Sequence, residues 1–169
     1  DPPPSLLLIG TLFAHNNRRN PATRSNAVLV NNYVYNPGGQ IIHFFHTNLD
    51  ITATGIAIEA GTNTEPGAAV FQNGGTVYAE DILDLADPRR LYGRGVTRVD
   101  SPTLVPPGLD LQTDVVPADD VRQLVTDIAG SRPANRPQIE ADLLTNRLNS
   151  SHGIIDSQDA VGGYPRYAA

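Results

Sequence analysis

Short apolar runs recur along the first half of the chain at a nearly constant spacing. Each run ends at a small or polar pivot residue, which is followed by a second apolar pair. The four segments are LLLIGTLFAHN, AVLVNNYVYNP, DITATGIAIEA and TVYAEDILDLA. Their pivots, Thr11, Asn32, Gly55 and Asp81, are 21, 23 and 26 residues apart. A period in the low twenties is typical of a solenoid, in which each coil buries its apolar face only by stacking on its neighbours.

The runs themselves have the composition of strands. They are rich in Val, Ile, Leu and Tyr and contain no proline, as hydrogen-bonded ladders require. We therefore expect residues 5–86 to stack as parallel rungs. Asn31 and Asn32 fit the corners between strands, because asparagine tolerates left-handed turns and bonds nearby backbone. The residues expected in the interior or on a shared face are Leu29, Tyr33 and Ile56.

The pattern changes after Asp87. Residues 88–117 are rich in proline and have no sustained period, which indicates an extended segment running over the outside. Helical spacing then predicts one helix from Ala118 that ends at Gly130, and a second that begins at Pro137. We expect these two helices to cover the end or the flank of the coil. Their expected buried residues are Val121, Leu124, Val125 and Ile128 in the first, and Ile139, Leu143 and Leu148 in the second.

Together these patterns predict an all-β solenoid over residues 1–87 and a C-terminal segment over 88–169 whose two short helices pack on it. A chain of 169 residues with 40% apolar content suits a single domain. Cysteine is absent, which excludes disulfides and thiolate metal sites. The apolar run Leu6–Ile9 is far too short to span a membrane, so we expect no membrane partner.

The charge is distributed unevenly. The formal net charge is -6, yet residues 1–49 hold Arg18, Arg19 and Arg24 against the single acid Asp1. All twelve basic residues are arginines, because the chain has no lysine. A small basic patch on an acidic body suits the local capture of an anionic group better than nucleic-acid binding, which needs a broad basic face.

The basic segment contains the motif Arg-x-Pro-x-x-Arg, from Arg19 to Arg24, in the loop that joins the first coil to the second. Its surroundings, GTLFAHNNRRNP and VLVNNYVYNPG, and the tail HGIIDSQDAVGGYP resemble the pectate lyases of polysaccharide lyase family 1. The resemblance is strong over residues 6–48 and 130–165. It implies a right-handed parallel β-helix and a lyase that cleaves α-1,4-linked polygalacturonate by β-elimination.

The resemblance also implies roles for individual residues. Arg19 corresponds to the arginine that removes the C5 proton of a galacturonate unit, and Arg24 to the arginine that binds the substrate carboxylate. A guanidinium is a poor base because it holds its proton tightly, so Arg19 needs desolvation and neighbouring positive charge. Arg18 is expected to supply that charge and to contact substrate, and His15 to line the same groove.

In this family acids on earlier rungs bind calcium, and a lysine on another rung contacts the substrate. Here only Asp1 precedes Arg19, and lysine and tryptophan are both absent. We therefore expect the chain to be the C-terminal part of a secreted or periplasmic enzyme, with Ca²⁺ ligands and half of the groove on a second polypeptide. The alternative is a non-catalytic β-helix that binds acidic polysaccharide or acts in adhesion.

Two other groups of residues are candidate metal ligands. His43 and His46 lie in an expected strand, where residues three apart face opposite ways, so we favour a structural role for both. Glu80, Asp81 and Asp84 are acidic neighbours that would suit calcium, but a solvated loop is the interpretation that we favour.

Overall fold

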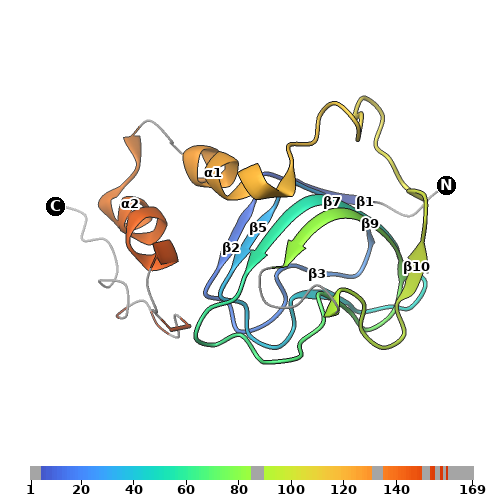
Figure 1. Cartoon of the computed structure of the whole chain (residues 1–169), viewed down its shortest axis with the longest axis horizontal. Coiled ribbons are helices and arrows are strands. Elements are labelled where there is room, and N and C mark those ends of the chain that lie inside the picture. Colours follow the sequence, from blue (N-terminus) through green and yellow to red (C-terminus); the bar gives the residue numbers. More distant parts are fainter. Residues whose placement is uncertain are drawn as a thin grey trace, which may run out of the picture.

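The computed structural model describes residues 5–84, 90–130, 135–149, 153–154, 157 and 159. This part of the chain forms a parallel β-solenoid of about four coils with two helices in its C-terminal region, which confirms the predicted fold class (Figure 1). None of the described helices is long and apolar enough to cross a lipid bilayer.

The described coils stack their strands on three faces, the third of which receives strands from the first three coils, and all of these strand pairs are parallel. The first face stacks β1 (Ser5–Ile9), β4 (Asn26–Val30), the first half of β7 (Asp50–Glu59), the first half of β9 (Thr76–Asp84) and β10 (Thr97–Val99). The second face stacks β2 (Leu12–Ala14), β5 (Tyr33–Tyr35) and the second halves of β7 and β9. The third face stacks β3 (Ala22–Thr23), β6 (Ile42–Phe44) and β8 (Phe71–Gln72).

A column of left-handed residues forms the corner between the first and second faces. The strand register places Gly10, Asn31, Gly55 and Asp81 one above another, with φ angles of 60, 51, 58 and 52°. Glycine, asparagine and aspartate are the residues that adopt this conformation most readily. The predicted pivots Gly55 and Asp81 are therefore correct.

The predicted pivots Thr11 and Asn32 are wrong by one residue. Thr11 precedes the pair Leu12 and Tyr33, so it stacks on Asn32 in the column next to the corner. The error arose because hydrophobic pattern alone does not distinguish which of two adjacent small or polar residues takes the left-handed conformation.

Asn31 fastens this corner to neighbouring segments. Its buried side-chain amide donates to the carbonyl oxygens of Gly55 at 3.3 Å and Val116 at 2.7 Å, and its Oδ1 accepts from the Val116 amide at 3.0 Å. Asn32 similarly donates to the Leu8 carbonyl and accepts from the Thr11 amide. The expectation that these two asparagines satisfy backbone groups at the corners is confirmed.

The interior of the solenoid is apolar and stacks from coil to coil. Leu29 and Ile56 lie in it, as predicted. The rings of Phe44, Phe71 and Tyr92 follow one another with centroid spacings of 6.3 and 6.0 Å. Tyr92 comes from the region predicted to be an outer loop. Stacking in fact continues past residue 87, as far as β10, which pairs with β9.

Helix α1 (Ala118–Ile128) packs on the outside of the second face, and α2 (Gln138–Thr145) and the 3-10 helix η3 (Arg147–Asn149) follow beyond it (Figure 1). A second apolar cluster joins them to that face. Its buried members are Tyr33, Tyr35, Ala57, Val121, Val125 and Leu148. The helices therefore lie on the flank of the coil, one of the two positions that we expected.

The predicted helix faces are only partly correct. Val121, Val125 and Leu148 are buried, but Ile128 and Ile139 are exposed. Leu124 and Leu143 are half-buried. The helices contact one flank of a narrow solenoid, so each buries a narrower stripe than its periodicity suggests.

Residues 100–117 run along the first face from β10 to α1, across the top of the view in Figure 1. Thr52 in β7 donates its hydroxyl to the Leu104 carbonyl at 2.7 Å. The Asp81 carboxylate accepts the Ala118 amide at 2.7 Å, which joins the corner of the solenoid to the first residue of α1. This segment is the outer excursion that the sequence predicted.

We predict that Asn31→Ala lowers the free energy of unfolding by roughly 2–4 kcal/mol, because it removes buried hydrogen bonds and places alanine at a positive φ. Asn31→Gly removes the same bonds but suits the left-handed backbone, so it should be less destabilising than alanine. Urea denaturation measures both, with the exposed Asn16→Ala as the control. An Asn31→Ala protein as stable as the control would contradict this account of the corner.

Candidate functional site

The arginine motif begins in the loop that follows β2 and extends through β3, so Arg19 precedes this strand and Arg24 follows it on the third face. Arg18 forms a parallel bridge with Gln40, and the amides of Arg19 and Asn20 donate to the carbonyls of Gln40 and Ile41, both at 2.6 Å. Arg19 has a left-handed backbone, with φ of 68°, and its side chain is exposed. The backbone of the motif is thus anchored to the next coil, and the side chains of both its arginines reach solvent while Asn20 and Thr23 are buried.

Arg19 and Arg24 converge on one aromatic ring. The guanidinium carbons lie 5.0 and 4.7 Å from the centroid of the Phe45 ring. Cations at this distance from an aromatic ring are attracted by its quadrupole. Among the described residues neither guanidinium forms an ion pair with a carboxylate. The pair therefore presents two uncompensated positive charges at a fixed place on the surface.

Phe45 reaches the arginines through the regular register of the coils. Thr23 pairs with Phe44, and the Phe45 amide donates to the Thr23 carbonyl at 3.1 Å, so Phe45 stacks on Arg24 of the preceding coil. The corner after Phe45 is longer than its neighbour, because Ile51 follows Phe44 by seven positions whereas Ala27 follows Thr23 by four. The longer spacing between the second and third pivots is a signal of this insertion, but sequence reasoning missed Phe45 itself.

His43 lies beside Phe45 in the same site. Its imidazole packs edge-on against the Phe45 ring with centroids 4.9 Å apart, and the Asn73 amide nitrogen is 3.4 Å from both ring nitrogens. Burial lowers the pKa of His43, and the positive charge of Arg19 lowers it further. A neutral imidazole at the edge of the arginine pair is thus favoured, and it can both donate and accept a hydrogen bond.

The structure places His15 away from the Phe45 ring. The side chain is buried, packs edge-on against Tyr35, and lies 3.1 Å from both the Arg147 carbonyl oxygen and the Asn36 amide nitrogen. These contacts join the second corner of the coil to η3. Arg18 remains exposed beside Arg19, but it has no contact with Phe45 comparable to those of Arg19 and Arg24.

The candidate metal ligands are dispersed in the structure. His46 is exposed beyond the end of β6, apart from the buried His43. Glu80, Asp81 and Asp84 lie in β9, so the interpretation as a loop is wrong. Glu80 accepts a hydrogen bond from the Tyr78 hydroxyl, which raises the pKa of Tyr78 to about 12. No group of three or more His, Asp or Glu side chains able to hold a metal occurs among the described residues.

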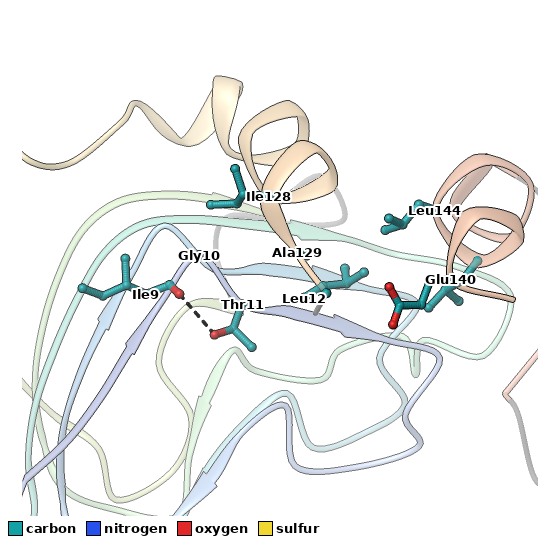
Figure 2. Close-up of a pocket in the computed structure, with 10 residues that line it drawn as sticks. Ile9, Gly10, Thr11, Leu12, Ile128, Ala129, Glu140 and Leu144 are labelled. Carbon is teal, nitrogen blue, oxygen red and sulfur yellow. Dashed lines mark hydrogen bonds between the residues drawn. The ribbon is translucent and has the colours of Figure 1, made fainter. Parts of the chain in front are cut away.

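A separate apolar cavity of about 490 Å³ lies between the first corner of the solenoid and the helices (Figure 2). Ile9, Leu12, Ile128 and Leu144 line it, with Glu140 at one side. No arginine lines this cavity, so it lacks the charge that would capture a carboxylate.

Searches against protein-family models, curated proteins and solved structures find no match to this chain. The fold defines its class as a parallel β-solenoid, and the arginine pair gives the candidate site a positive charge. The C-terminal segment that resembles pectate lyases, residues 152–165, lies mostly outside the described residues.

We predict that Arg19→Gln raises the pKa of His43, because one of the two causes of its depression is removed. Burial is the larger cause and remains, so the pKa should stay below that of a free imidazole. Imidazole proton shifts followed by NMR across the titration measure this. Arg24→Gln, which removes the other charge from the same ring, is the matched control and should leave the His43 pKa unchanged.

The same depression makes stability depend on pH. The unfolded chain binds a proton at His43 more readily than the folded chain does. The free energy of unfolding therefore has its full value above the ordinary imidazole pKa and decreases as the pH falls through that pKa. The Arg19→Gln protein should lose less stability on acidification than the wild type, and an equal loss would argue against proximity of the two groups.

Proposed function

We propose that this chain is part of a polysaccharide lyase that cleaves polygalacturonate-like uronans, with Arg19 and Arg24 in its substrate site. The observation that carries the proposal is the convergence of both guanidinium groups on the Phe45 ring within the Arg-x-Pro-x-x-Arg loop. The resemblance of that loop to pectate lyases supports the choice of reaction.

Two guanidinium groups held on one ring suit a polymer that carries a carboxylate on every sugar unit. The planar fork of arginine matches a carboxylate with two parallel hydrogen bonds. The ring contact orients each fork before binding, so less side-chain entropy is lost when the sugar arrives. Because the protein as a whole carries a net charge of -6, the anionic polymer is attracted to this patch and repelled elsewhere.

In the proposed reaction Arg24 binds the carboxylate of the galacturonate unit and Arg19, in its neutral form, accepts the C5 proton. The electrons of the broken C5–H bond form the C4–C5 double bond as the C4–O bond breaks, and the leaving oxygen takes up a proton. No enzyme nucleophile takes part, so no covalent intermediate is expected. Binding of the carboxylate by a cation makes the C5 proton more acidic.

The described residues do not provide a calcium site, so we assign no step of this chain to a metal. We place the Ca²⁺ ligands on further coils of a second polypeptide that stacks on β1. Within the described residues β1 pairs with β4 alone, and Leu7 and Ile9 are exposed on it. An open parallel edge with exposed apolar side chains is suited to receive another coil. A polysaccharide substrate of this kind places the enzyme outside the cell or in the periplasm.

The second candidate is a non-catalytic uronan-binding or adhesion protein. The exposure of Arg19 favours it, because an exposed guanidinium with several donors can serve as a carboxylate ligand without taking part in a reaction. The two functions differ in a single measurement. A lyase releases an unsaturated product that absorbs in the ultraviolet when the protein, assembled with its second polypeptide, meets polygalacturonate and calcium. A binding protein retains the polymer and gives no such absorbance.

We predict that Arg19→Lys in the assembled protein abolishes most turnover while substrate affinity changes little, because lysine keeps the charge but not the position of the accepting nitrogen. Steady-state rates on polygalacturonate and direct binding measurements separate the two effects. Turnover near the wild-type rate would show that Arg19 is not the base and would favour the binding protein.

Arg24→Lys should have the opposite profile. Loss of the bidentate fork weakens carboxylate binding by roughly 1–3 kcal/mol, whereas the proton-accepting group is unaffected. We therefore expect a higher KM with kcat largely retained. Arg98→Lys is the control, because Arg98 is an exposed arginine on β10 that pairs with Asp100. A fall in kcat alone for Arg24→Lys would contradict its assignment as a binding residue.

A further inference from the structure

His43 lines a cavity of about 480 Å³ on the third face, next to the arginine pair. It lies in β6 between its strand partners, Ala22 of the first coil and Gln72 of the third. Phe45 and Arg94 line the same cavity. An imidazole ordinarily changes its charge between pH 5 and 8, whereas an arginine stays protonated. Among the described lining residues, His43 is therefore the one whose charge can respond to pH in this range.

The charged side chains that face His43 from the neighbouring coils are arginines. In the first coil, the guanidinium carbons of Arg19 and Arg24 lie 5.0 and 4.7 Å from the centroid of the Phe45 ring. The His43 imidazole packs against that ring with centroids 4.9 Å apart, and Arg94 of the fourth coil lines the cavity. No acidic side chain lines it, and in the described part of the chain none of these arginines forms an ion pair with a carboxylate. A proton on His43 thus adds a further positive charge to a cluster that lacks compensation.

The third coil presents a neutral group to the imidazole. The amide nitrogen of Asn73 is 3.4 Å from both ring nitrogens of His43. An amide nitrogen donates a hydrogen bond, and a neutral imidazole has one nitrogen that accepts. A protonated imidazole donates from both nitrogens and has no acceptor for Asn73. The hydrogen bond and the arginine charges therefore both favour a neutral His43 in the free protein.

We propose that His43 makes the arginine site sensitive to pH, because an anionic sugar bound by Arg19 and Arg24 compensates their charge and allows the imidazole beside them to take up a proton. The site then binds its acidic ligand more tightly as the pH falls. The inference rests on the proposed uronan site and concerns its regulation. Coupling of this kind is reciprocal: if the ligand favours protonation of His43, protonation of His43 favours the ligand to the same extent.

The direction of the effect follows from this linkage. Burial, and then the charge of Arg19, lower the pKa of His43 in the free protein. A bound carboxylate cancels part of the arginine charge and raises that pKa again, while the contribution of burial remains. Affinity for the anion therefore has its lower value above the His43 pKa of the complex. It increases as the pH falls through that pKa, and is constant again below the pKa of the free protein.

The test is a calorimetric titration of galacturonate trisaccharide into the full chain at several pH values between about 8 and 5, where carboxylates of this kind remain ionised. We expect the affinity of wild type to increase roughly fivefold across this range, the lower end of the coupling usual between linked sites. Near the midpoint, binding should take up a fraction of a proton, which repetition in buffers of different ionisation enthalpy measures. NMR titration of the wild-type imidazole, with and without the trisaccharide, should give a higher His43 pKa in the complex.

Two variants assign the response to one imidazole. His43→Gln keeps hydrogen-bonding groups but does not titrate, so its affinity should be nearly constant across the range. His46→Gln is the matched control, because His46 is an exposed histidine beyond the end of β6, and it should keep the full response. If His43→Gln does not fold, the NMR titration of wild type decides alone.

Two results would overturn the proton linkage and leave the uronan site in place. One is a His43→Gln protein that keeps the pH response of wild type. The other is a wild type that binds the trisaccharide equally well at every pH, with the His43 pKa unchanged by the ligand. A wild type that binds the trisaccharide at no pH would instead overturn the proposed function, and this inference with it.

Discussion

The hydrogen-bonded stacking of one coil on the next is the constraint on which the rest of this structure depends. Each strand satisfies its backbone groups only through the coils beside it, so the register of one coil sets that of its neighbours. The left-handed corner at Gly10, Asn31, Gly55 and Asp81 allows this register to persist from the first face to the second. A change at one corner therefore disturbs the coils on both sides.

The candidate site lies beside a local departure from that regular stacking. Phe45 follows the register and so stacks on the arginines of the preceding coil. The corner that comes after it contains three more residues than its neighbours, and the additional chain moves outward because the strands on both sides remain in register, which places Thr47 over Gly74 of the following coil. A regular scaffold thus positions a surface feature without any contribution from its core.

The helices and the outer segment stabilise the other faces and leave the third face open. Tyr33 donates to Glu59, which also pairs with Arg122 of α1 at 3.0 Å, so a polar link accompanies the apolar contact on the second face. Burial of Tyr33 and its bond to Glu59 raise its pKa, and the phenol therefore remains a donor in this link. Phe45 and the two arginines lie on this third face.

The sequence by itself determined the repeat, because the period of apolar runs and the absence of proline within them follow directly from the needs of stacked strands. It also determined which residues carry the positive charge. It did not determine the exact corner residues. Asn31 and Asn32 are both asparagines, and only the strand register shows which of them takes the left-handed conformation at the corner. Nor did it determine that Phe45 meets two arginines. Those contacts join residues about 20 to 26 positions apart, and only the stacking of complete coils in register brings them to the same face.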